Sequence, residues 1–179
     1  MQELKTFKPD QIKIVTNAVA IAEDLVSNHY KMSASEWLRP KYDVKTLADL
    51  TPEEIVDGPF AQIIRYEAQR KDTSLGSFAY DYYKICLQDH AIHTALESSP
   101  GLQLFPFTLY IVTHELIHIV RFSKFLQSFD ASAEDRMAEE KRVHHKTRMI
   151  LSDIQITGIS DVLRFYDHWQ MPYEELQQV

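Results

Sequence analysis

The most constraining feature of the sequence is the pattern His-Glu-x-x-His within the apolar run of residues 111–120. On a helix, His114 and His118 lie one turn apart on the same face, so both imidazoles can reach one metal ion. Glu115 lies one step round the helix, where its carboxylate can hold or deprotonate a water on that metal. The apolar neighbours predict a buried helix, and buried histidines and carboxylates need polar partners. A metal ion is the simplest partner that satisfies all three groups.

Composition excludes several classes of protein. The net charge of −7 argues against a nucleic-acid partner, because phosphate contacts need a basic surface. Cys86 is the only cysteine, so we expect neither disulfides nor a thiolate zinc site. The longest apolar run is too short and too interrupted by charge to span a membrane, and the N-terminus lacks the apolar core of a signal peptide. We therefore expect a cytoplasmic protein without a membrane partner.

Apolar residues recur at helical spacing along most of the chain, and strand signals are weak. The scarcity of glycine, with 4 residues, also argues against a sheet with many tight turns. The sequence predicts an all-α fold, a single domain over residues 1–179 built as a bundle of about five main helices, with loose tails at 1–8 and 171–179. The predicted helices cover residues 9–30, 59–70, 78–97, 104–126, 133–156 and 160–170, with shorter ones near 33–38, 46–50 and 52–57.

The predicted helix 133–156 carries Glu140 and His144 one turn apart on its inward face. Glu139 and His145 are expected to point more toward solvent, and Glu139 is the fallback ligand if the helix phase is off by one residue. Further acids and histidines lie at or near apolar positions of the helices predicted before the motif. For each of them, a surface position or an ordinary hydrogen bond is the simpler interpretation. These candidates are Glu67, Asp89, His90, His93 and Glu97.

Residues 111–120 resemble the active-site helix of zinc metallopeptidases. In the gluzincin group of these peptidases the third zinc ligand is a glutamate on a helix downstream of the motif, and Glu140 looks like that ligand. The resemblance implies that His114, His118 and Glu140 bind zinc. It also implies that Glu115 acts as the general base toward water, and that His144 stabilises an oxyanion or holds Glu140 in place.

Zincin peptidases usually present their substrate along an edge strand of a sheet that precedes the motif helix. Residues 59–110 are predicted to be helical here, so the sequence predicts no such strand. The expected partner is therefore a substrate that is either a peptide or a small molecule.

Two other interpretations of the same residues stay open. A ferritin-like bundle would hold iron or manganese through Glu115 and His118, with Glu67 and either Asp89 or Glu97 as single acids. Its second Glu-x-x-His pair is missing, because Glu140 and His144 are four residues apart. Alternatively, the histidines and acids form a buried hydrogen-bonded network in a partner-binding bundle that holds no metal.

Overall fold

The computed structural model describes residues 4–37, 41–69 and 79–168, and it corrects the predicted fold class. The described chain is mixed α/β and not all-α, because it contains a three-stranded sheet. The elements are α1 (Pro9–Tyr30), α2 (Ala34–Trp37), β1 (Lys41–Lys45), η1 (Leu47–Asp49), η2 (Pro52–Glu54), β2 (Ala61–Gln69), β3 (Ala79–Leu87), α3 (Asp89–Ser98), α4 (Leu104–Ser123), α5 (Ala133–Ser152) and α6 (Ile159–His168).

The strand order in the sheet is β1-β3-β2. β1 runs parallel to β3, with Val44 opposite Ile85, and β2 runs antiparallel to β3, with Ile63 opposite the same residue. Both β1 and β2 are therefore edge strands of the described sheet. The three strands that the structure describes need few tight turns, so the low glycine content does not exclude a sheet.

The sequence prediction placed helices where β2 and β3 lie. In β3 the buried residues Tyr83, Ile85 and Leu87 alternate along the strand and share one face. Tyr83 stacks on Phe122 of α4 with ring centroids 5.9 Å apart, so this face meets the helices. The stretch is dense in aromatic and apolar residues, and such a run matches the helical period as well as the strand period. Its aromatic and β-branched content favoured the strand.

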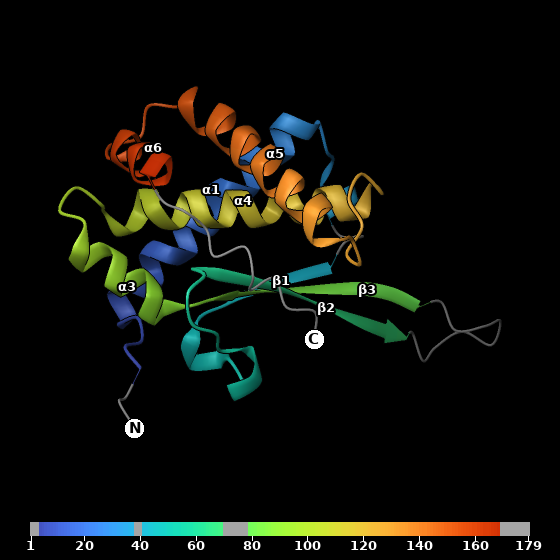
Figure 1. Cartoon of the computed structure of the whole chain (residues 1–179), viewed down its shortest axis with the longest axis horizontal. Coiled ribbons are helices and arrows are strands. Elements are labelled where there is room, and N and C mark those ends of the chain that lie inside the picture. The colour runs from blue at the N-terminus through green and yellow to red at the C-terminus, as the bar shows by residue number, and fades with distance from the viewer. Residues whose placement is uncertain (1–3, 38–40, 70–78, 169–179) are drawn as a thin grey trace.

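The helices α1, α4, α5 and α6 lie on one face of the sheet, and α4 is at the centre of that layer (Figure 1). α4 contacts α1, α5, α6 and both strands of the β2–β3 pair, so it is buried along most of its length. Phe107 of α4 packs edge-on against Phe60 and Phe165, with centroids 5.0 and 5.4 Å apart. None of the described helices combines the length and apolarity that crossing a membrane requires.

The other helix predictions are confirmed, with shifts at the ends. α1 has the predicted bounds, whereas α4 and α5 end a few residues early, at Ser123 and Ser152. The predicted tail 171–179 lies outside the described residues, as do residues 1–3 of the other predicted tail. Within the rest of that N-terminal segment, Phe7 is buried and its N–H donates to the Asp89 carboxylate (2.8 Å). Burial of Phe7 fastens this segment to the start of α3.

A buried ion pair lies on the opposite face of the sheet. Lys84 of β3 donates to both carboxylate oxygens of Glu54 (2.7 Å each), which also accept from the Tyr66 hydroxyl and the Thr51 N–H. Burial disfavours the charge of Glu54, but these hydrogen bonds outweigh that cost and lower its pKa to about 2. The pair joins η2 to the central strand.

Replacing Lys84 with methionine leaves the Glu54 carboxylate buried without its cation. We expect Lys84→Met to lower the free energy of unfolding by about 2–3 kcal/mol at pH 7, measured by urea denaturation. Adding Glu54→Gln to it should restore most of the loss. Because the pKa of Glu54 is lowered, its contribution is present above pH 4.5 and is lost as the pH falls toward 2. An unchanged stability of the single variant at pH 7 would contradict this assignment.

Candidate metal centre

Three side chains from two helices meet in the interior. His114 and His118 of α4 lie one turn apart, and Glu140 of α5 faces both of them. The Glu140 carboxylate oxygens lie 3.1 Å from His114 Nε2 and 2.9 Å from His118 Nε2, and the two Nε2 atoms are 3.2 Å apart. Each side chain belongs to a residue that is only 4% exposed. The described part of the chain holds no other such convergence of histidines and acids.

The spacing of these atoms fits one metal ion. For tetrahedral zinc with bonds of about 2.0–2.1 Å, the ligand atoms lie about 3.3 Å from one another. The two Nε2 atoms are separated by close to that value, and so is each Nε2 atom from the Glu140 oxygen that it faces, Oε2 for His114 and Oε1 for His118. Two imidazoles and a carboxylate are also a donor set that binds zinc, and one coordination position remains for water or substrate. The residues present therefore fit a metal ion.

In the metal-free protein, electrostatic attraction between the Glu140 carboxylate and the two histidines holds the site together. Burial opposes the charge of the Glu140 carboxylate, but the neighbouring His118 and His114 outweigh it and hold its pKa well below the usual range. Burial likewise lowers the pKa of His118, yet the facing Glu140 carboxylate raises it overall to about 9. The metal-free protein thus contains an imidazolium–carboxylate pair, and a metal ion has to displace the His118 proton.

The loop after α4 orients one of the histidines. Gln127 lies in this loop, and its Oε1 is 2.9 Å from His118 Nδ1. An amide oxygen only accepts, so this contact holds a proton on Nδ1 and makes Nε2 the nitrogen that gives up its proton to bind a metal. His114 Nδ1 has no such partner within the described chain. The role of Gln127 was not predictable from helical spacing, because its position depends on how the loop folds back on α4.

Glu115 directly follows His114 on α4 and is half-buried. Burial raises the pKa of its carboxyl, and the nearby charge of Glu140 adds to that rise, whereas His114 and His118 oppose it. A carboxylate with a raised pKa is a better proton acceptor than an exposed one. The residue therefore has the environment that a general base needs.

His144 lies one turn after Glu140 and touches the same cluster. Its ring centroid is 4.3 Å from that of His114, and its Nδ1 lies 2.7 Å from the Tyr110 hydroxyl. Burial and the neighbouring His114 lower the pKa of His144 to about 3, so it is neutral at pH 7. Tyr110 stacks on Tyr166 of α6 with centroids 4.0 Å apart. When Tyr110 donates to Nδ1, the proton of the neutral imidazole is on Nε2, which can then donate.

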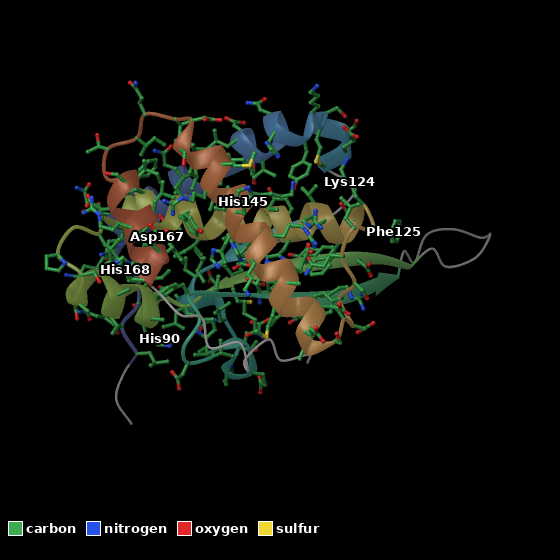
Figure 2. All side chains as sticks on the ribbon, turned by 45° about the horizontal axis from the view of Figure 1, so that its top comes forward. His90, Lys124, Phe125, His145, Asp167 and His168 are labelled. Carbon is green, nitrogen blue, oxygen red and sulfur yellow. The ribbon has the colours of Figure 1, made fainter. Side chains whose placement is uncertain are left out.

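Glu139 corrects one sequence prediction. It was expected to point toward solvent, but it is buried and forms ion pairs with Arg121 of α4 and Arg142 of α5. The guanidinium of Arg121 satisfies its carboxylate, which therefore does not reach the histidine pair. His145 is exposed, as predicted, and lies on α5 (Figure 2).

The remaining candidates lie elsewhere. Asp89 accepts from the Phe7 and Leu47 amides, and Glu97 pairs with Lys5 at the surface. His93 Nε2 contacts the Thr6 carbonyl (3.3 Å).

His90 lies at the start of α3, and its Nε2 is 3.4 Å from the Asp57 carboxylate. In Figure 2, His90 and His145 of α5 lie well apart. Glu67 lies in β2 opposite Asp81, and its side chain is outside the described part of the structure.

The structure thus brings together His114, His118, Glu140 and His144, with Glu115 next to them on α4. Tyr110 was missed, although it lies four residues before His114 and hence on the same helix face. No protein-family model matches the chain, and neither the curated proteins nor the solved structures contain a match.

The three converging side chains predict a stoichiometry of about one zinc per chain. We expect Glu140→Gln and His118→Ala to lose the metal, because each removes one ligand of a small set. Glu139→Gln should keep it, since Arg121 holds that carboxylate. Elemental analysis and calorimetric titration with zinc measure both effects, with His145→Ala as the exposed control on the same helix. Full zinc binding by Glu140→Gln would contradict the assignment.

Proposed function

We propose that the protein is a zinc-dependent hydrolase that cleaves amide bonds in peptides. The observation that carries the proposal is the spacing of 2.9–3.2 Å among the donor atoms of His114, His118 and Glu140, with Glu115 beside them. This is the residue set that the resemblance to zinc metallopeptidases implies. A bound zinc ion would polarise the substrate carbonyl and make water acidic enough to react near neutral pH.

Glu115 is assigned the proton transfers. Its carboxylate accepts a proton from the attacking water and passes it to the nitrogen of the leaving amine. Burial, which raises its pKa, keeps the carboxyl suited to both accepting and releasing that proton. Because Glu115 is next to His114 in the chain, its position follows that of the proposed ligands.

We assign to His144, oriented by Tyr110, the stabilisation of the negative charge that develops on the carbonyl oxygen. His144 is held against the His114 ring, and its hydrogen bond to Tyr110 selects the tautomer with a proton on Nε2. A fixed N–H donor beside the reacting carbonyl stabilises the oxyanion more than it stabilises the substrate. The low pKa of His144 keeps it a neutral donor across the working range of pH.

The sheet supports a peptide as substrate. The sequence predicted no strand before the motif helix, yet β2 is an antiparallel edge strand that precedes α4 and contacts it. An edge strand offers backbone groups to an extended peptide, which is how β-augmentation positions a chain. Arg65 of β2 lies over the Phe129 ring at 4.7 Å, which joins this strand to the loop that carries Gln127.

The identity of the metal is part of the proposal. Two histidines and one carboxylate also bind non-haem iron, so iron or manganese stays the alternative cofactor. The ferritin-like bundle is not proposed, because the described chain is α/β and its acids Asp89 and Glu97 are bonded elsewhere. A metal-free polar network is the alternative if the purified protein contains no metal and chelators leave its melting temperature unchanged.

Glu115→Gln separates the general base from the ligands. We expect the variant to bind zinc as the wild type does and to lose about a thousandfold in kcat/KM on a fluorogenic peptide library. The amide keeps the size of the side chain but accepts no proton. If the variant loses zinc, Glu115 is a ligand, and if it keeps full activity, Glu115 is not the base.

Tyr110→Phe tests the orientation of His144. Removing the hydroxyl should lower kcat about tenfold with a small change in KM, and His144→Phe should lower kcat about a hundredfold, while both variants keep zinc. Tyr83→Phe is the matched control, because it removes the hydroxyl of another buried tyrosine that stacks on α4. Equal kcat values for Tyr110→Phe and the control would exclude a role for this hydrogen bond.

A further inference from the structure

A groove of about 920 Å³ lies between α1 and the strand β1, and the proposed reaction uses none of the residues that line it. One wall comes from the side of α1 that carries Ile12, Val15 and Val19, and the other comes from β1 and the residues that follow it. The α1 side of the groove thus presents apolar side chains, and the opposite wall is the edge of a sheet.

β1 pairs with β3 on one side, and the described chain supplies no strand on its other side. A strand paired on one side leaves backbone N–H and C=O groups available for another chain. An added strand would have to displace the hydrogen bond that the Val44 N–H donates to the side chain of its neighbour Asp43 (2.9 Å). This edge is therefore a place where an extended segment can add as a further strand.

The two faces of β1 differ in character. Tyr42 and Val44 share the face that meets α1, since the Tyr42 hydroxyl donates to Glu23 of that helix. Asp43 and Lys45 share the opposite face and pair with each other at 3.1 Å. An added strand would continue this alternation, so every second side chain would enter the apolar space below α1 and the others would face away from it.

The lining of the groove is acidic. Glu23, Asp24, Asp43 and Asp49 line it against a single lysine, Lys45. Asp24 and Asp49 are exposed, and within the described residues the one lysine of the groove, Lys45, pairs with Asp43 and also interacts with the charge of Asp49. The acids of the groove thus outnumber its cation. A segment with basic side chains would be attracted, and an acidic one would be repelled.

We propose that the outer edge of β1 and the adjoining face of α1 bind an extended peptide segment whose side chains alternate between apolar and basic. The occupant adds to β1 as a strand, its apolar side chains contact Val15, Val19 and Val44, and its basic side chains meet Asp43 and Asp49. The surface recruits a partner protein that carries such a segment. It does not depend on the hydrolase proposal.

The test uses the full chain and a fluorescent peptide of about seven residues that alternates valine and lysine, a length that covers β1. Anisotropy should show saturable binding, and a valine–glutamate peptide should bind at least about tenfold more weakly. Asp43→Lys/Asp49→Lys should weaken binding of the valine–lysine peptide by about tenfold. The control Glu53→Lys/Asp153→Lys, with the same change in charge at exposed positions outside the groove, should leave it within about twofold.

Hydrogen exchange locates the bound peptide, and mass spectrometry verifies that it is intact. Protection of residues 41–45 on binding supports the proposal. Protection of β2 in their place, or equal binding by both double variants, overturns it. Failure of both peptides to bind also overturns it. The acidic residues would then serve to prevent unwanted strand pairing at this edge. A second copy of the chain is the occupant if residues 41–45 become protected without peptide as the protein concentration rises and light scattering shows a dimer. That result also overturns the proposal.

Discussion

Glu140 contacts the Nε2 atoms of both His114 and His118 across the interface of α4 and α5. A carboxylate this deeply buried is costly unless its neighbours supply compensating charge and hydrogen bonds. The imidazoles meet that need in the metal-free protein, and a divalent cation would meet it in a metal-bound one. The contact constrains where α5 lies on α4, and it thereby places His144, one turn further along, against His114.

Other buried acids are bonded to partners of their own, so Glu140 is the carboxylate that contacts the histidines. Glu139 is as buried as Glu140 but is held by Arg121, while Asp89 is held by the amides of Phe7 and Leu47. The exposed Phe125, with a left-handed φ of 55°, follows α4 at the point where the chain turns (Figure 2). This turn lets the following loop bring Gln127 back to His118. The loop and the arginine thus determine the environment of the site as much as the motif does.

The sheet provides edge strands to which an extended peptide could add. An all-α bundle would enclose the histidine pair. The observed sheet gives α4 a neighbouring edge strand on one side, and within the described residues it leaves the outer edge of β1 unpaired on the other. The two edges differ in direction and in surroundings: β2 is antiparallel to the central strand, and β1 borders an acidic groove under α1. One edge supports the proposed peptide substrate, and the other supports the proposed docking of a basic segment.

The sequence by itself determined the local geometry of the site. The four-residue spacing of His114 and His118 lies within one helix, and so does that of Glu140 and His144, because side chains one turn apart share a face. Only the tertiary structure decided that β1 pairs with residues 82–86, since such pairing joins distant segments whose patterns are ambiguous when taken alone. It also decided that Glu139 is buried, because its partner Arg121 comes from another helix and a long-range ion pair leaves no trace in helical periodicity.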